Sequence, residues 1–364
     1  MQFMTKLIAF HLPQFHSIPE NDKWWGKGFT EWVNTKKAMP SFPSHYQPRE
    51  PLNDNYYDML DYETRKWQAD LAKKNGIYGF CYYHYWFNGK LLLEKPLEML
   101  LDEKDIDMNY CFCWANEPWT RAWDGSEKEV IMPQEYGKEE EWESHFKYLL
   151  KFFKDKRYIK NEGRPMLVIY RTNNIPHCEE MIDYFEKRCL ESGFNGIYVI
   201  EEKNSFQKQG VCKNSKAVME FEPMNTIVND KDFIKKCYDK VNYIINRNPY
   251  KDKIMYFDYD NVWKKIIKRK ITKDGKKKIL GAFVDWDNTA RKGTKATVFK
   301  GASPEKFEKY MKEQFKKAKK EDVDFIFINA WNEWAEGTYL EPDKKYGYSY
   351  LEKIKKIVSE ENNN

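Results

Sequence analysis

Several motifs that identify common classes of protein are missing from this sequence of 364 residues. None of its seven cysteines forms a Cys-x-x-Cys pair, so the usual spacing of a zinc site or a redox dithiol is absent. No Gly-x-Gly-x-x-Gly or Gly-x-x-x-x-Gly-Lys-Ser/Thr motif follows the early apolar runs, which argues against a nucleotide-binding fold. No stretch is long and apolar enough to span a bilayer, so we expect no stable membrane insertion.

A strong net charge is also missing. The formal charge is +5, from 62 basic and 57 acidic residues, which is too small and too mixed to indicate nucleic-acid binding. The densest basic stretch, residues 264–278, is expected to form a solvated helix and turn; the alternative is a surface that meets an anionic glycan or a membrane. The odd number of cysteines fits reduced thiols, and the N-terminal apolar run is too short for a signal peptide. We therefore expect a cytoplasmic protein, or a periplasmic or secreted one if a signal peptide has been removed; the oligomeric state stays open.

Aromatic residues, in contrast, are abundant. They make up 17% of the chain, with 13 Trp, 25 Tyr and 23 Phe. Any single ring is explained by packing in an aromatic-rich core. Clusters of rings among Asn, Glu and Arg are not, because a core does not bury so much polar surface without partners.

Eight short apolar runs alternate with helical patterns, which predicts an α/β fold with parallel strands and right-handed crossovers. Eight such units favour a single (β/α)₈ TIM barrel with long βα-loops over an open sheet. The predicted strands are residues 6–12, 76–83, 108–114, 165–170, 196–201, 217–221, 279–284 and 324–330. The predicted helices are residues 62–74, 91–101, 139–153, 181–190, 227–245, 304–318 and 348–358. No linker is seen, so residues 1–364 are expected to form one catalytic domain, with residues 359–364 as a disordered tail.

Polar and aromatic residues follow nearly every predicted strand. In such barrels the active site lies where the strands end and the βα-loops begin. The eighth run ends in Trp331, Asn332, Glu333, Trp334 and Glu336, which places two carboxylates three residues apart between indoles. Paired carboxylates serve as acid and base in sugar chemistry, and Gly337 lets the backbone turn sharply or approach a ligand closely. A capping or salt-bridging pair is the structural alternative.

Other strand ends supply candidate substrate-binding groups. The third loop offers directional hydrogen bonds and stacking surfaces for sugars, and the long first loop is able to cover the barrel mouth. His84 follows the second strand, where a packing role is the alternative. The candidates besides the eighth strand are Trp25, Glu31, His84, Tyr85, Trp114, Asn116, Glu117, Arg121, Trp123, Asp285 and Trp286. No local spacing supports a metal site, and we expect no metal or cofactor.

Five motifs, in this order along the chain, resemble the WbsX-type domain, which is related to glycoside hydrolase family 99, the endo-α-mannosidases and endomannanases. They are His11-Leu-Pro-Gln-Phe-His16, Trp24-Trp-Gly-Lys-Gly-Phe-Thr-Glu-Trp32, Gly79-Phe-Cys-Tyr-Tyr-His-Tyr-Trp-Phe87, Trp114-Ala-Asn-Glu-Pro-Trp-Thr-Arg121 and Trp331-Asn-Glu-Trp-Ala-Glu-Gly337. The resemblance covers nearly the whole chain and implies a (β/α)₈ barrel with a role in bacterial surface polysaccharides.

The resemblance also implies roles for the two glutamates. In family 99 the first glutamate of the last motif is a base on the sugar 2-hydroxyl, which gives a 1,2-anhydro intermediate and net retention. The second is the general acid and then the base for water. By motif these roles fall on Glu333 and Glu336. This chain has Ala335 where the mannosidases often carry a bulkier residue.

The leading prediction is therefore a retaining, endo-acting glycoside hydrolase that cleaves a bacterial surface polysaccharide or a mannose-type glycan without a cofactor. Two alternatives stay open. One is a glycosyltransferase in O-antigen, capsule or lipopolysaccharide biosynthesis, although Asp285-Trp-Asp287, which has the Asp-x-Asp pattern, ends a predicted barrel strand. The other is a catalytically silent glycan-binding barrel.

Overall fold

A computed structural model describes residues 5–121, 126–203, 212–229, 254–271 and 275–362. Eight parallel strands close into a barrel, in which each strand pairs with the next along the chain and the last pairs with the first. The barrel strands are β1 (Lys6–His11), β2 (Gly79–Phe87), β4 (Asn109–Trp114), β8 (Arg164–Ile169), β9 (Tyr198–Lys203), β10 (Ala217–Glu220), β12 (Lys277–Phe283) and β14 (Phe325–Asn329). The predicted (β/α)₈ barrel is confirmed.

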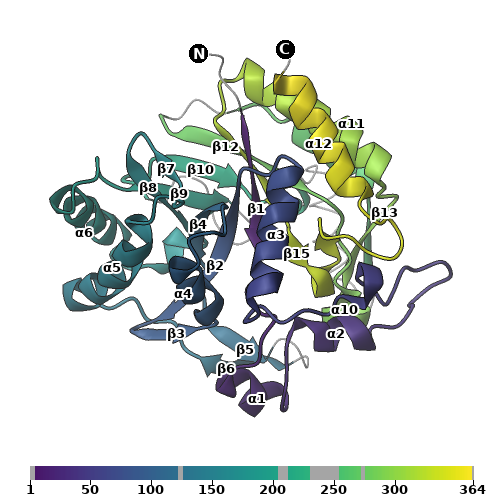
Figure 1. The fold of residues 1–364 in the computed structure, drawn as a ribbon, viewed down its shortest axis with the longest axis horizontal. Coiled ribbons are helices and arrows are strands. Elements are labelled where there is room, and N and C mark those ends of the chain that lie inside the picture. The colour runs from purple at the N-terminus through teal and green to yellow at the C-terminus, as the bar shows by residue number, and fades with distance from the viewer. Residues whose placement is uncertain (1–4, 122–125, 204–211, 230–253, 272–274, 363–364) are drawn as a thin grey trace, which may run out of the picture.

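Helices surround this barrel (Figure 1). They are α3 (Tyr62–Lys74), α4 (Lys95–Asp102), α5 (Glu139–Phe153), α6 (Cys178–Glu191), α7 (Met224–Asn229), α9 (Tyr259–Lys268), α11 (Pro304–Lys320) and α12 (Ser349–Asn362). Helix α11 shows why they form where they do: the Ser303 hydroxyl accepts the Lys306 N–H at its start, Pro304 occupies the first turn and lysines fill the last turn.

Side chains of β2 alternate between the barrel interior and the surrounding helices. Phe10 of β1 contacts Tyr83 of β2 and Phe327 of β14 inside the barrel, each at a ring-centroid distance of 5.6 Å. His84, the next residue on β2, instead meets His145 of α5. The odd-numbered residues of β2 therefore face the interior, and its end carries Tyr85 toward the barrel mouth.

The βα-loops carry short elements of their own. These are α1 (Pro19–Trp25), α2 (Glu31–Lys37), η1 (Leu52–Asp54), β3 (Lys90–Leu92), β5 (Trp119–Arg121), β6 (Ser126–Met132), η2 (Thr172–Asn174), β11 (Met255–Asp258), α10 (Thr289–Lys292), η3 (Gly293–Lys295), β13 (Thr297–Lys300), β15 (Asn332–Glu333), η4 (Trp334–Glu336) and β16 (Thr338–Tyr339); β7 (Lys160–Asn161) precedes β8. Helices α1, α2 and α10 gather at the end of the barrel where β1 ends, in the lower part of Figure 1.

Some sequence expectations need correction. The predicted disordered tail is wrong for residues 359–362, which continue α12 as helix. Residues 264–278 are not only helix and turn, because their last part begins barrel strand β12. Of the helix predicted over residues 227–245, the structure describes only the part up to Asn229, in α7; the rest lies outside the described residues. None of the described helices has the length and apolar character needed to cross a bilayer.

Candidate active site

Glu333 and Glu336 lie just beyond the end of β14. Glu333 ends the short strand β15, which pairs with β16, and Glu336 ends the 3-10 turn η4 between them. Gly337 follows in the left-handed region, with φ 64°. A Cβ atom there would lie 2.8 Å from the Asp287 carbonyl oxygen, so only glycine allows the motif to approach the end of β12 this closely.

Glu333 is a buried carboxyl group with little to stabilise its charge. Only 6% of its surface is exposed, and its Oε2 atom has no hydrogen-bond partner within the described residues. Burial raises the pKa of Glu333 well above its usual range, and the negative charges of Glu336 and Glu31 raise it further, while Arg291 opposes them. The surroundings of Glu333 therefore favour its protonated form.

Arg291 supplies the positive charge of the site. It lies on α10, in the loop that follows β12, and its guanidinium donates to Glu336 Oε1. Burial lowers the pKa of Arg291, but the carboxylates of Glu336, Glu31 and Glu333 outweigh burial and raise it. One arginine thus faces three carboxyl groups, and it is bonded to Glu336.

A third carboxyl group comes from the first βα-loop. Glu31 begins α2 and is fully buried; its Oε1 accepts the Ala335 N–H at 2.9 Å, between the two glutamates of the motif. Its Oε2 has no hydrogen-bond partner within the described ranges. Burial raises the pKa of Glu31 to about 7, against the opposing effects of Arg291 and the Ala335 N–H.

Glu117 and Tyr85 extend the cluster toward the second and third strands. Glu117 is bound by Arg171; burial raises its pKa, although Arg171 and Arg291 lower it. Burial also raises the pKa of Tyr85 well above its usual range, and the charge of Glu333 contributes. Glu31, Tyr85, Glu117, Glu333 and Glu336 are thus brought together as the sequence predicted.

The indoles and amides around the glutamates hold the motif from inside. Trp334 stacks on Tyr339 with a centroid distance of 3.9 Å, and its Nε1–H donates to Glu341 at 2.7 Å. Asn332 accepts the Leu12 N–H and donates to the Leu12 carbonyl, which ties the motif to the end of β1. Asn332 and Trp334 therefore position the glutamates in this structure.

Three other predicted binding residues are buried. Trp331 packs against Phe80, and the Trp114 Nε1–H donates to the Trp86 carbonyl. The Asn116 side chain donates to the Arg171 carbonyl and accepts the Arg171 N–H. None of the three exposes more than 2% of its surface, so they present no open ring face or amide in this structure. Their contact with a sugar stays a prediction.

The structure places His84 away from the carboxyl cluster. Its Nε2 lies 2.9 Å from Nε2 of His145 on α5, and its ring stacks on Tyr148 of the same helix. Burial lowers the pKa of His84 to about 3, so the ring is neutral. His84 is corrected from a substrate-binding residue to a packing residue, because the alternation along β2 turns it outward.

Asp285 and Trp286 follow β12 and lie beside the motif. Arg49 donates to Asp285 Oδ2 at 2.9 Å, and Trp286 is buried with its Nε1–H unpartnered among the described residues. Trp25 is half-buried at the end of α1 against Phe29. Arg121 ends β5, but its side chain lies outside the described part, as does the whole of Trp123.

Sequence reasoning missed Arg291 and Glu341. Arg291 lies three positions beyond Asn288, the last of the polar residues that directly follow the seventh predicted strand. Glu341 accepts from Trp334, Gln68 and Tyr57, and burial raises its pKa to about 7. A buried carboxyl group four residues beyond the motif had no local signal, since Gln68 and Tyr57, two of its three partners, come from distant segments.

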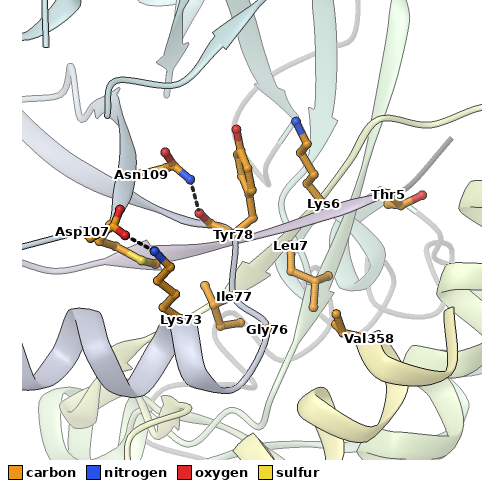
Figure 2. Close-up of a pocket in the computed structure, with 11 residues that line it drawn as sticks. Thr5, Lys6, Leu7, Lys73, Gly76, Ile77, Tyr78, Asp107, Asn109 and Val358 are labelled. Carbon is orange, nitrogen blue, oxygen red and sulfur yellow. Dashed lines mark hydrogen bonds and ion pairs between the residues drawn. The ribbon is translucent and has the colours of Figure 1, made fainter. Parts of the chain in front are cut away.

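A separate hollow lies at the opposite end of the barrel (Figure 2). It has a volume of about 230 Å³ and is lined by residues at and just before the starts of β1, β2 and β4, together with Lys73 of α3 and Val358 of α12. Lys73 and Asp107 form an ion pair at its edge, and Tyr78 and Asn109 are hydrogen-bonded beside it. It lies where the strands begin, and none of the catalytic candidates lines it. Across the described ranges, no group of three or more His, Cys, Asp or Glu side chains is placed to hold a metal ion.

The sequence matches a family model described as "Glycosyltransferase WbsX" over residues 7–354. Two curated relatives, each called "Uncharacterized protein WxcX", come from Xanthomonas campestris pv. campestris strains B100 and ATCC 33913. Each is 32% identical over 368 residues, covering 97% of this chain and 49% of the relative. The chain therefore spans about half the length of the curated relatives it matches.

The fold is similar to that of solved glycoside hydrolase structures. The GH99 endo-alpha-mannosidase from Bacteroides thetaiotaomicron aligns with a TM-score of 0.56 at 13% identity, and its complex with bis-tris-propane with 0.59 at 14%; both cover 100% of this chain and 99% of the other. A glycoside hydrolase-like protein aligns with a TM-score of 0.58 at 12% identity, over 98% of this chain and 96% of the other. At these identities the likeness concerns the fold alone, and it agrees with the predicted barrel.

Proposed function

We propose that this chain, which belongs to the WbsX family, is a carbohydrate-active enzyme that hydrolyses a bacterial surface polysaccharide or a mannose-type glycan, endo-acting and with retention. The observation that carries the proposal is the pair Glu333 and Glu336 at the end of β14. One member is buried with a raised pKa and the other is bound to Arg291. Two carboxyl groups in different environments are what acid–base cleavage of a glycosidic bond requires.

The reaction needs one proton on the pair. Glu336 gives a proton to the leaving oxygen while Glu333 takes the proton of the sugar 2-hydroxyl, whose oxygen attacks the anomeric carbon. The product of this step is a 1,2-anhydro sugar. Glu336 then removes a proton from the water that attacks the anomeric carbon, while Glu333 returns its proton to the 2-oxygen as the C1–O2 bond breaks. Both carboxyl groups thereby regain the states they had at the start of the reaction, and the original anomeric configuration is kept.

In the unliganded protein this proton is assigned to Glu333, because burial favours its protonated form, while the Arg291 guanidinium donates a hydrogen bond to Glu336. Transfer of one proton from Glu333 to Glu336 produces the reactive form. The unpartnered Oε2 of Glu333 is the acceptor available to the 2-hydroxyl. A hydroxyl bound there stabilises the carboxylate form of Glu333, so substrate binding itself favours the transfer.

Purified protein should be screened against a panel of bacterial polysaccharides and mannans, with released oligosaccharides as the readout. We expect Glu333→Gln and Glu336→Gln to lose at least about 100-fold in kcat, since acid–base groups contribute that much or more. Glu305→Gln, an exposed residue of α11, is the matched control and should behave as wild type. Full activity of both active-site variants would sink the proposal.

Glycosyl fluorides separate the two roles, because fluoride leaves without protonation. Glu336→Gln should retain much of its activity on a fluoride of the cognate sugar, while Glu333→Gln should remain inactive. The reverse pattern would exchange the assignments and leave hydrolysis standing.

The description of the family favours a second candidate, a glycosyltransferase in O-antigen, capsule or lipopolysaccharide biosynthesis. Such an enzyme binds a nucleotide-sugar or lipid-linked donor. Calorimetry with a set of nucleotide sugars tests it: saturable binding together with extension of an acceptor glycan favours transfer over hydrolysis. Glycan binding that survives loss of both carboxyl groups, without any turnover, would indicate a glycan-binding barrel.

A further inference from the structure

A pair of aromatic rings lies on the surface beside the loop that follows α2. Phe42 and Tyr256 meet edge to face, with centroids 5.6 Å apart, and Tyr256 of β11 is 46% exposed. The Lys300 ammonium at the end of β13 lies 4.7 Å from the centre of the Phe42 ring and 3.9 Å from that of Tyr256. We call Phe42 and Tyr256 the ring pair; with Lys300 above it, the pair forms a cationic aromatic surface.

Contacts connect the ring pair directly to the carboxyl cluster. Phe42 stacks on His45 at 4.1 Å, and His45 Nε2 lies 2.6 Å from Asp287 Oδ2. The Asp287 N–H donates to the Glu336 carbonyl oxygen at 2.8 Å. The ring pair is therefore a near neighbour of Glu336 and belongs to the same end of the barrel, where α2 and α10 lie in Figure 1.

Three more exposed lysines lie on the elements between the ring pair and the cluster. Lys37 ends α2, Lys292 ends α10 and Lys295 ends η3. Ala38 packs against Ala290 and Ala335, which brings the ends of α2 and α10 together beside the motif. We call Lys37, Lys292, Lys295 and Lys300 the lysine rim.

Carboxylates of the described residues do not neutralise the charges of the lysine rim. Within the described ranges, no carboxylate lies within ion-pair distance of any of the four ammonium groups. Asp258, which is opposite Lys300 in the β11–β13 pair, accepts the Asn261 N–H instead. The rim therefore leaves four cations available to a ligand, next to a cluster of the opposite charge.

We propose that the lysine rim and the ring pair bind the uronic-acid residues of an acidic polysaccharide, one or a few sugars away from the bond at Glu336. The proposal rests on the proposed function, because it assigns the class of substrate for the same site. Ring faces stack on the C–H faces of a sugar, and ammonium groups pair with its carboxylate. The distance between the acidic sugar and the cleaved bond matters, because the carboxyl groups of Glu333 and Glu336 would repel an anionic sugar. A neutral sugar at these glutamates and an acidic sugar at the lysine rim match the negative charge of the cluster and the positive charge of the rim.

A nucleic acid or an anionic membrane suits this surface less well. Either one would present continuous negative charge to the rim and to Glu336 together, whereas a glycan is able to place a neutral sugar at Glu336 and an acidic sugar at the rim. Both are included as outcomes below.

Affinity electrophoresis and calorimetry with polygalacturonate, phosphomannan and neutral mannan test the proposal. The variant Lys292→Ala/Lys295→Ala/Lys300→Ala removes three rim charges, and Lys309→Ala/Lys319→Ala/Lys320→Ala removes three exposed lysines of α11 as the matched control. We expect tight, salt-sensitive binding of polygalacturonate by wild type. The rim variant should weaken it by about tenfold, as lost cation–carboxylate contacts predict, and the control by less than about twofold. Tyr256→Ala should weaken binding at high salt, where stacking persists.

Equal losses in the two triple variants would show a non-specific charge effect and overturn the proposal. So would equal binding of neutral mannan, binding of phosphomannan alone, or stronger rim-dependent binding of DNA or phosphatidylglycerol vesicles than of polygalacturonate. Glu336→Gln separates the two proposals: the lysine rim stays intact, so its polygalacturonate binding should be at least as tight as that of wild type whether or not the substitution abolishes turnover.

Discussion

Arg291 is the cation on which the arrangement of the carboxyl groups depends, so its removal gives the sharpest test. In Arg291→Met the side chain loses its charge. Glu336 then lacks its donor, and Glu31 and Glu333 lack the positive charge that lowers their pKa values. Breaking a fully buried pair costs about 3–5 kcal/mol. Arg291 and Glu336 are 25% and 19% exposed, so we expect a smaller loss of about 2 kcal/mol in the free energy of unfolding near neutral pH.

The pH dependence of this loss identifies its cause. A carboxyl group whose folded-state pKa lies above its unfolded value costs stability, and the cost is absent below the unfolded pKa and complete above the folded pKa. Arg291 lowers the folded pKa values of Glu31 and Glu333, so its removal raises both further. The difference between variant and wild type should therefore be full at about pH 8 and fall to roughly half or less at about pH 5.5.

Urea unfolding of wild type, Arg291→Met, Glu336→Gln and the double variant at both pH values measures this. The double variant removes the donor and the acceptor together, so most of the lost stability should return. A penalty of equal size at both pH values, or a double variant as unstable as the sum of the single ones, would refute the electrostatic account and indicate lost packing.

Three further predictions use the same measurement. Gly337→Ala should lose about 2–3 kcal/mol, since its Cβ would meet the Asp287 backbone, while Gly347→Ala, also at positive φ but in open space, should lose only about 1 kcal/mol. His84 and His145 are buried and neutral, with the pKa of His84 lowered to about 3, so they cost stability as pH falls below about 6.5. Between about pH 8 and pH 5, the free energy of unfolding of wild type should therefore fall by about 2 kcal/mol more for each buried histidine than that of His84→Phe/His145→Phe. His177→Phe, a substitution at an exposed position, should not reduce this fall. Burial raises the pKa of Glu341 to about 7, so this group should lower the free energy of unfolding of wild type as pH rises from about 4.5 to 7. In Glu341→Gln this contribution should be absent.

The barrel was predictable because its signals are local. Helices α3 and α5 begin and end at the predicted residues, and each barrel strand overlaps a predicted apolar run. A buried strand or an amphipathic helix repeats its apolar pattern over enough residues to be recognised without knowledge of its neighbours. The pairs β5–β6 and β11–β13 were not predicted, because short strands in loops carry no such repeat.

The site was predictable only in part, for the same reason. The two glutamates, Glu31, Tyr85 and Glu117 followed from the rule that barrel sites lie at strand ends. The outward direction of His84 needed the exact register of β2, since a shift of one residue reverses the face on which a side chain lies.

The sequence by itself determined the barrel, the family and the position of the paired glutamates, because apolar periodicity and contiguous motifs are properties of neighbouring residues. Only the tertiary structure decided the electrostatics. The contact of Arg291 with Glu336, the contact of Glu31 with the Ala335 N–H, and the burial of Glu333 join segments tens to hundreds of residues apart. The proton distribution depends on burial and on charges close in space, and no pattern along the chain encodes those distances.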